Sequence, residues 1–366
     1  MRPWDRFITA AFLIGIMLPG AATLAGVDGG GDTENRELAP WPLLRTDGES
    51  LRTLPDAFTR YFEDHFAFRS SLVTAQSWLR LEVLKTPAEP TVIRGREGWL
   101  FYADDGAIED YAVATTVSPS DLEAFRDTLQ RTQDWLNGRG IAYAFLIAPD
   151  KHVVYPEMMP ATLRPFSSTT RIDQLVAYLR QHSTVNVVDV RAALVDAKSR
   201  ERVYHRTDTH WNDRGAHIAY ERIMAAVGLR AFPREDYTAE ARTVPGMDLA
   251  WMLNLTGRLT EEDLALVPRQ PRQARTVIPA NVQPHGQYAR VVTEHPDSTL
   301  PRAVVYRDSF ATGLIPFLSE HFSRAVYLWE RDLDPAVIEA ERPQVVIQEW
   351  VGRRIGVYTP YDPFQQ

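Results

Sequence analysis

The fold of this chain is decided by one stretch of sequence, Ala303-Val304-Val305-Tyr306-Arg307-Asp308-Ser309-Phe310. A run of β-forming residues ends abruptly at Asp308-Ser309, and an apolar, helix-like stretch continues from Phe310 to Phe322. A strand that passes directly into a helix is the repeating unit of parallel α/β sheets. Ligands bind such sheets at the carboxyl ends of the strands. Ser309 is therefore predicted to lie at the tip of a buried strand, where functional side chains gather.

The same alternation of strands and helices recurs along much of the chain. Strands are expected over 92–102 (with a turn), 141–148, 185–190, 302–306, 325–329 and 344–349, and helices over 170–181, 213–227, 310–322 and 335–342. Another helix is expected to begin at Ser118-Pro119-Ser120-Asp121, which combines a hydroxyl cap, a proline and an acid. Residues 229–300 are rich in Pro, Arg, Thr and Gln and predict a loop-rich insertion with short strands. The predicted fold is a three-layer α/β sandwich with a mainly parallel sheet.

A second segment supplies an acid and a base, Arg206-Thr207-Asp208-Thr209-His210-Trp211-Asn212. Asp208 and His210 are two residues apart, so in an extended backbone their side chains point the same way. The Asp208 carboxylate can then orient the His210 ring, which can take the proton of Ser309. These three residues predict a Ser-His-Asp triad and acyl-transfer chemistry, with the backbone N–H of Ser309 as the first oxyanion donor.

Each part of this site also has a structural interpretation. Ser309 could cap the helix that follows it, Asp208 and His210 could pair without catalysing anything, and Asp308 is expected to be a turn carboxylate. Four histidines could surround a metal together with Asp208, but they fit no recognised ligand spacing: His152, His205, His210 and His217. No metal and no cofactor are expected.

Composition narrows the class of protein. The chain has 366 residues and a net charge of −8, with no basic block, which argues against a nucleic-acid partner. It contains no cysteine, which excludes a cysteine nucleophile, disulfides and zinc–thiolate sites. The length accommodates one large domain or two smaller ones.

Residues 1–27 predict a membrane anchor or a signal segment. The run 7–27 is uncharged, with Arg2 and Arg6 before it and acidic residues after it, which predicts an N-in, C-out orientation. A cleaved signal peptide would use the small residues 22–25, but the length of the run favours an uncleaved anchor in the inner membrane. Either outcome places the rest of the chain outside the cytoplasm, in the periplasm of a cell with two membranes. Residues 28–48 are expected to be a tether, and 49–366 the catalytic domain.

Several blocks along the chain form a pattern: Glu34-Asn35-Arg36-Glu37-Leu38-Ala39-Pro40, residues 61–69, 95–101, 148–151 and 155–157, Thr207 to Asn212, Gly246-Met247-Asp248-Leu249, and Arg307 to Phe310. In this order and spacing they resemble the SGNH-hydrolase-like domain of the alginate O-acetylation proteins, over nearly the whole chain after the first segment. The family's Asp and His fall on Asp208 and His210, and its nucleophile on Ser309.

The resemblance implies transfer of acetyl groups to hydroxyls of a cell-envelope or extracellular polysaccharide through an acetyl-serine intermediate. It also implies a multi-spanning membrane acyltransferase as acetyl supplier. Two alternatives stay open. The same triad with water as acceptor would make a polysaccharide acetylesterase or deacetylase, and a chain that only kept the fold would be a non-catalytic scaffold of an exopolysaccharide export complex.

Four further residues are candidates for contacts to the oxyanion or the substrate: Arg307, Arg353, Asn212 and Lys151. Arg307 stands where the superfamily has a glycine, which favours an altered turn or oxyanion geometry and is the feature in favour of a scaffold. Arg353 could face the cleft, although a surface position is expected. The indoles of Trp99, Trp211, Trp329 and Trp350 are expected in the core rather than as sugar platforms.

Overall fold

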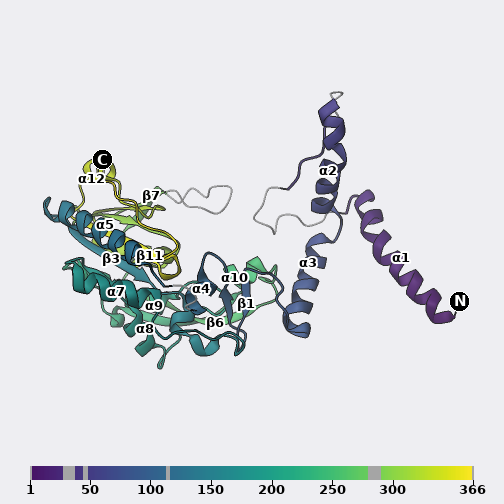
Figure 1. Ribbon diagram of the computed structural model, residues 1–366, viewed down its shortest axis with the longest axis horizontal. Coiled ribbons are helices and arrows are strands. Elements are labelled where there is room, and N and C mark those ends of the chain that lie inside the picture. The colour runs from purple at the N-terminus through teal and green to yellow at the C-terminus, as the bar shows by residue number, and fades with distance from the viewer. Residues whose placement is uncertain (1, 28–37, 44–47, 113–115, 279–289, 365–366) are drawn as a thin grey trace. The chain divides into compact units, whose positions relative to one another are not determined.

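The computed structural model describes residues 2–27, 38–43, 48–112, 116–278 and 290–364 (Figure 1). The chain divides into two compact units. Met1–Ala88 and Leu253–Leu255 belong to the first, and Glu89–Met252 with most of the remaining chain belongs to the second. Most of the predicted tether, and most of the sequence block that begins at Glu34, lie outside the described residues.

The first unit contains helices α1 (Pro3–Leu24), α2 (Gly48–His65) and α3 (Arg69–Trp78), and a π-helix, η2 (Leu79–Leu84). By length and composition, Pro3–Thr23 could cross a membrane, as the sequence predicts. The second unit begins at Glu89. That the catalytic domain begins at residue 49 stays a prediction. The aromatic residues of α2 and α3 follow a helical period, yet Phe58, Phe62 and Trp78 stay 40–50% exposed.

The second unit is built on a seven-stranded sheet of order β4-β3-β11-β9-β10-β8-β7. Its strands are β3 (Ala142–Ala148), β4 (Val187–Asp189), β7 (Arg275–Ile278), β8 (Arg290–Glu294), β9 (Arg302–Tyr306), β10 (Arg324–Leu328) and β11 (Val345–Val351). The five strands from β4 to β10 are parallel, whereas β8 and β7 are added in antiparallel pairings. The sheet is therefore mainly parallel, as predicted.

Helices cover both faces of this sheet. One face packs against α5 (Pro119–Asn137), α7 (Arg171–His182) and α12 (Pro335–Glu341), and α5 runs alongside β3 (Figure 1). The other face packs against α8 (Arg191–Ala197), α9 (Asp213–Ala226), the 3-10 helix η5 (Phe310–Leu314) and α11 (Ile315–Leu318). Side chains of β3 alternate between these two faces. Tyr143, Phe145 and Ile147 pack on the side of α5 and α7, and Ala144, Leu146 and Ala148 pack on the side of α8 and α9. The three-layer α/β sandwich is confirmed.

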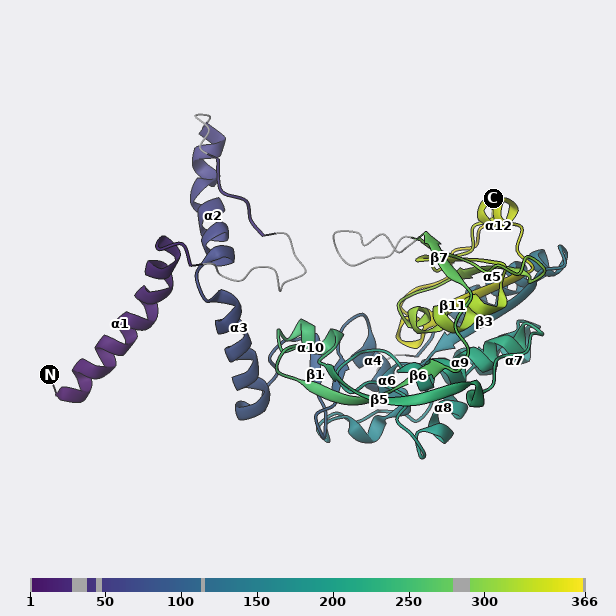
Figure 2. The same cartoon turned by 180° about the vertical axis from the view of Figure 1, so that it is seen from behind.

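Two antiparallel pairs lie outside the sheet. β1 (Val92–Arg94) pairs with β2 (Leu100–Tyr102), and β5 (Tyr237–Pro245) pairs with β6 (Thr260–Pro268) along nine residues each (Figure 2). Residues 229–300 were expected to be loops and short strands, but they contain this ribbon and two strands of the sheet. The inward positions of β6 carry Glu261 and Asp263 while Leu264 points outward, so the strand lacks the usual apolar alternation.

Shorter helical segments complete the second unit: α4 (Ala107–Ala112), α6 (Lys151–Val154), η3 (Pro156–Met158), η4 (Arg234–Asp236), α10 (Asp248–Met252), η6 (Ser319–His321) and η7 (Gly352–Arg354). The helix expected over 310–322 is divided into η5, α11 and η6. Pro316 stands at the start of α11, where a missing N–H interrupts the hydrogen-bond ladder. The start of α5 follows the prediction, because the Ser118 hydroxyl accepts a hydrogen bond from the Asp121 N–H at 3.0 Å.

The first turn of α9 tolerates no side chain at Gly215. A Cβ atom there would overlap the Val203 carbonyl oxygen and lie 2.8 Å from the Trp211 Cβ. We expect Gly215→Ala to lower the free energy of unfolding by about 1–3 kcal/mol, because backbone atoms must shift to make room. Gly257→Ala is the matched control, since nothing lies within 4 Å of the added Cβ. Urea titrations of both variants test this, and equal stabilities would contradict it.

Candidate active site

Asp208 and His210 lie in the loop that leads into α9. The Nδ1 atom of His210 lies 2.6 Å from Asp208 Oδ1, and the His210 backbone N–H donates to the same oxygen at 2.9 Å. Asn212 ends the loop as the N-cap of α9, where its Oδ1 accepts from the N–H groups of Arg214 and Gly215. The acid and the base are thus held in one short segment by their own backbone.

Ser309 follows β9 at the carboxyl edge of the sheet. Its hydroxyl oxygen lies 2.7 Å from His210 Nε2, although the two residues are 99 positions apart. Ser309 makes no side-chain cap to η5, so the capping interpretation is not what the structure shows. The arrangement defines the tautomer: His210 donates from Nδ1 to Asp208, and its Nε2 can accept the proton of Ser309.

The charges around His210 favour its protonated form. Burial alone would lower the pKa of His210, but the Asp208 charge and hydrogen bond, with Asp248 and Asp308 nearby, raise it above its usual value. Burial would likewise raise the pKa of Asp208, but His210 holds it well below the usual range. The pair can therefore stabilise an imidazolium as it forms.

Lys151 fixes the loop that carries the acid and the base. It lies on α6, just after β3, and its buried ammonium donates to the carbonyl oxygens of His205, Arg206 and Asp208 at 3.0, 3.2 and 2.6 Å. Burial lowers the pKa of Lys151 to about 8. Because all three donors of the ammonium are used in this way, Lys151 supports the loop and is not turned toward an oxyanion.

Glu261 binds the other side of the same loop. Its carboxylate, buried on β6, accepts hydrogen bonds from the N–H groups of Arg206 and Thr207, from the Thr207 hydroxyl, and from His205 Nδ1, all at 2.8–3.0 Å. Burial alone would raise the pKa of Glu261, but these donors, led by His205, lower it to about 2. The loop is thereby held through its N–H groups by an anion and through its carbonyls by a cation.

The turn that carries Ser309 is held by two carboxyl groups. Asp308 accepts from the N–H groups of Phe310 and Val351, both at 2.9 Å, which agrees with the expected turn carboxylate. The Asp308 N–H donates to Glu349 at 2.9 Å. Glu349 is fully buried on β11, and burial together with the Asp308 charge raises its pKa well above the usual value. A neutral Glu349 can therefore lie beneath the turn without repelling Asp308.

Arg307 and Arg353 are both buried and both engaged. The Arg307 guanidinium donates to the Asp308 carbonyl and the Thr312 hydroxyl, each at 3.1 Å. These hydrogen bonds stabilise the turn that carries Ser309. Arg353 forms an ion pair with Asp150 at 2.6 Å, and its backbone N–H donates to the same carboxylate. The expected surface position of Arg353 is therefore wrong, because the carboxylate at the end of β3 draws it inward.

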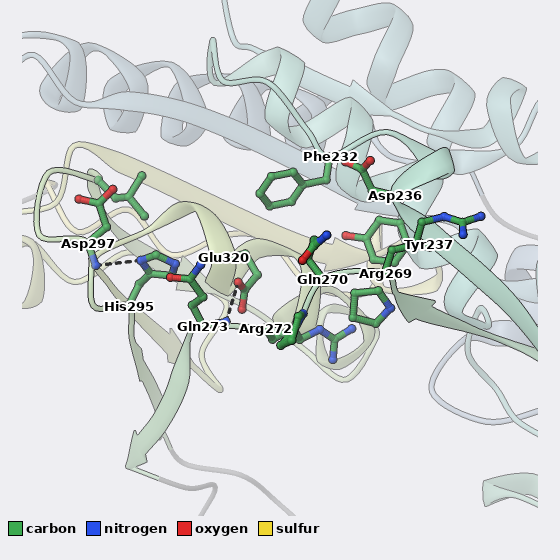
Figure 3. A pocket seen from close by; sticks show the side chains of 13 residues that line it. Phe232, Asp236, Tyr237, Arg269, Gln270, Arg272, Gln273, His295, Asp297 and Glu320 are labelled. Atoms are coloured by element: carbon green, nitrogen blue, oxygen red, sulfur yellow. Dashed lines mark hydrogen bonds between the residues drawn. The ribbon is translucent and has the colours of Figure 1, made fainter.

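A cavity of about 450 Å³ opens at the carboxyl edge, next to the turn of Ser309. It is lined by Arg307, Asp308, Trp329, Glu330, Arg331, Asp332 and Arg354. Trp329 is the indole in this lining, whereas Trp99, Trp211 and Trp350 are buried in the core, as expected. Another cavity, of about 500 Å³, is lined by Tyr237 of β5, by Arg272 after β6, by His295 after β8 and by Glu320 of η6, among others (Figure 3). No residue of the Asp208–His210–Ser309 cluster lines it.

Among the described residues, two groups of side chains have ligand atoms close enough for a metal ion, within 4.8 Å of one another. In the buried group of Asp110, Asp150 and His152, Asp150 is already neutralised by Arg353 and His152 is bonded to Asp110 at 3.0 Å. The other group is Asp208 and His210 with Asp248. A metal ion there would need the lone pair of His210 Nδ1, but this nitrogen carries the proton that is donated to Asp208. Neither donor set fits a resident metal well.

The family model of the SGNH hydrolase-like domain of the acetyltransferase AlgX matches residues 92–327, which include Asp208, His210 and Ser309. The chain belongs to this family. Among curated relatives, the probable alginate O-acetylase AlgJ of Pseudomonas aeruginosa is 26% identical over 293 residues, which cover 75% of this chain and 71% of that protein. The Pseudomonas putida protein of the same name is 28% identical over 205 residues, 54% of this chain and 51% of the relative.

The family fold also appears in a solved structure. The Bacillus cereus PatB1 structure with a sulfonyl adduct superposes with a TM-score of 0.54 at 16% identity, over 74% of this chain and all of the other. This similarity shows a shared fold and supports the SGNH-like architecture.

Two residues of the site were not found from the sequence, Glu261 and Asp248. Glu261 belongs to a strand whose inward residues are acidic, so the apolar pattern does not reveal it. Asp248 stands in the block Gly246-Met247-Asp248-Leu249, which contributes to the family resemblance but carried no assigned role.

Proposed function

We propose that this chain is an O-acetyltransferase that acetylates hydroxyls of a cell-envelope or extracellular polysaccharide through an acetyl group carried on Ser309. The observation that supports it most directly is the contact of 2.7 Å between Ser309 Oγ and His210 Nε2, with Asp208 on the opposite ring nitrogen. Membership of the acetyltransferase family supports the reaction, and the names of the AlgJ relatives support a polysaccharide acceptor.

In the first half-reaction, His210 Nε2 accepts the proton of Ser309 while Oγ attacks the carbonyl carbon of an acetyl donor. The negative charge moves to the carbonyl oxygen, and the Ser309 N–H, at the end of β9, is one donor to it. The tetrahedral adduct collapses, and the leaving group takes the proton from Nε2. Ser309 then carries the acetyl group.

In the second half-reaction, His210 removes the proton of a sugar hydroxyl, whose oxygen attacks the acetyl-serine carbonyl. The collapse of this adduct returns the proton to Ser309 Oγ and releases the acetylated sugar. The cavity beside Asp308 supports acceptor binding, since it combines the Trp329 ring with the guanidinium groups of Arg331 and Arg354. Arg307, Asn212 and Lys151 each donate to neighbouring protein groups, so we assign them to the frame of the site.

The helix α1 supports a location in the cell for the second unit. A helix able to span the membrane would hold the second unit at the outer face of the inner membrane, in the periplasm. Acetyl groups would reach it from a multi-spanning membrane acyltransferase, as the resemblance to the alginate O-acetylation proteins implies.

The two alternatives make different demands on this site. An acetylesterase would use the same atoms with water as the acceptor, and only the acceptor preference separates it from a transferase. A scaffold needs no contact between Ser309 and His210. The short contact at a half-exposed serine therefore favours an enzyme.

The proposal is tested on the full-length protein in detergent with an activated acetyl ester. We expect mass spectrometry to find one acetyl group on Ser309, and added oligosaccharide to divert acetyl groups from water to sugar hydroxyls. Peptides from the Ser309→Ala protein should stay unmodified. A folded protein that neither releases the alcohol nor carries an acetyl group would overturn the proposal, and acetylation of Ser309 without transfer to any oligosaccharide would support the esterase.

A further inference from the structure

The segment Gly246-Met247-Asp248-Leu249 binds the loop that carries the acid and the base. Met247 N–H donates to the Thr207 hydroxyl at 3.2 Å, and Leu249 N–H donates to the Thr207 carbonyl at 3.1 Å. Gly246 lies where a Cβ atom would approach the Ala250 Cβ to 2.5 Å, so the segment packs too closely for a side chain there. The start of α10 is therefore fitted to this loop.

Asp248 faces His210 from this segment. One carboxylate oxygen accepts from the Thr209 N–H at 2.7 Å, and the other lies 3.6 Å from His210 Nδ1. Asp208 lies 2.6 Å from the same nitrogen. Two carboxylates thus flank one edge of the imidazole, and successive N–H groups of the loop bind them: Thr209 binds Asp248, and His210 binds Asp208.

We propose that Asp248 is a second positioning carboxylate for His210, which holds the ring for proton transfer with Ser309 and stabilises the imidazolium together with Asp208. This inference rests on the proposed function and adds a fourth residue to the triad of Asp208, His210 and Ser309. Asp248 does not touch the reacting atoms and acts through His210. A movement of less than about 1 Å would bring the oxygen that faces His210 within hydrogen-bonding distance of Nδ1, so Asp248 can also take over part of the role of Asp208.

The surrounding charges agree with this role. The groups that face His210 are Asp208, Asp248 and, from the turn of Ser309, Asp308. Behind the loop, Lys151 faces Asp208 and Asp248, and His205 with Glu261 lies beyond it. Burial and the Asp208 charge raise the pKa of Asp248, whereas that of Asp208 is lowered. As the pH falls, Asp248 is therefore the first of the two to lose its charge.

The test uses Asp248→Asn in the full-length protein. The amide keeps an acceptor for the Thr209 N–H and removes the charge. We expect kcat/KM for an activated acetyl ester to fall about tenfold at its plateau, less than the ~10²–10⁴-fold that a proton-transfer residue itself contributes, because Asp248 acts through His210. Since a nearby negative charge favours the imidazolium, its removal lowers the pKa of His210. The acid limb of the pH profile should therefore move to lower pH.

A double-variant cycle separates this role from support of the fold. In the Asp208→Ala background, Asp248→Asn should cost about 100-fold rather than tenfold, because the second carboxylate is then the one left to orient the ring. The control is Asp196→Asn, the same change at a carboxylate that is 69% exposed on α8. It should leave both rate and pH profile unchanged.

The outcomes distinguish the inference from the proposed function. Suppose that Ser309→Ala abolishes ester cleavage but Asp248→Asn leaves the acid limb of the pH profile in place, or lowers kcat/KM by the same factor in the wild-type and Asp208→Ala backgrounds. The proposed role of Asp248 is then refuted, while the proposed acetyltransferase function stands. If Ser309→Ala has no effect, the proposed function itself fails. If Asp208→Ala does not fold, the rate at which a sulfonyl fluoride modifies Ser309 is measured against pH in the wild type and in Asp248→Asn. A shift of this profile to lower pH in Asp248→Asn supports the role of Asp248, and an unchanged profile refutes it.

Discussion

The Ser309→Ala protein is expected to cleave an activated acetyl ester at least about 10³-fold more slowly than the wild type, as in other enzymes that lose a triad nucleophile. The substitution removes the oxygen that lies 2.7 Å from His210 Nε2 and leaves the turn otherwise intact, because its side-chain hydrogen bonds come from Arg307, Asp308 and Glu349. Initial rates with a chromogenic acetyl ester and an unchanged circular-dichroism spectrum test this.

The control is Ser199→Ala, which removes an exposed hydroxyl at the end of α8 and should leave the rate unchanged. His210→Ala should be nearly as slow as Ser309→Ala, and the double variant no slower than either, because residues that act as a unit are not additive. Ester cleavage by Ser309→Ala within tenfold of the wild type would show that a different group carries the reaction.

Glu261→Gln is expected to lower the free energy of unfolding by about 3 kcal/mol at pH 7, the size that follows from its lowered pKa. In the folded protein the pKa of Glu261 is about 2, against an ordinary value of 4.5. The proton is thus bound more weakly in the folded state, and the stabilisation is complete above pH 4.5. It disappears as the pH falls toward 2.

The stability difference between wild type and Glu261→Gln should therefore be constant above about pH 5 and shrink below pH 4.5. Urea titrations of both proteins between pH 3 and pH 7 measure this. The neighbouring exposed carboxylate on the same strand offers a control, and Glu262→Gln should cost little at any pH. A difference that grew on acidification would mean that Glu261 is not an anion in the folded protein.

The fold class could be predicted because most of the main strands are short apolar runs followed by helices. The run from Ala303 to Tyr306 stops at Asp308-Ser309 in the structure as in the pattern. The β5–β6 ribbon was not predicted for a physical reason: the inward face of β6 is acidic. Glu261 is bound by His205 from a distant segment, and Asp263 is bound by Arg242 of β5 with Arg214 of α9 at 3.5 Å. Such a strand is recognisable only after its partners are in place.

The site divides in the same way. Asp208 and His210 are two residues apart in sequence, and Ser309 follows the end of a strand, so local patterns were enough to select them as the triad that we propose. The remaining contacts depend on the tertiary fold. Lys151, Glu261 and Asp248 approach the loop of Asp208 from α6, β6 and α10, and nothing in their own sequence surroundings indicates which loop they meet.

The position of β11 in the sheet has a consequence for how the protein folds during its synthesis. This strand lies between β3 and β9, and it pairs with both, although it is the last of the seven strands to be synthesised. A growing chain that already contains His210 and Ser309 still lacks the strand that joins their two halves of the sheet, and Glu349 beneath the serine turn is missing as well. We therefore expect the turn of Ser309 to reach its final geometry only after β11 has been added to the sheet.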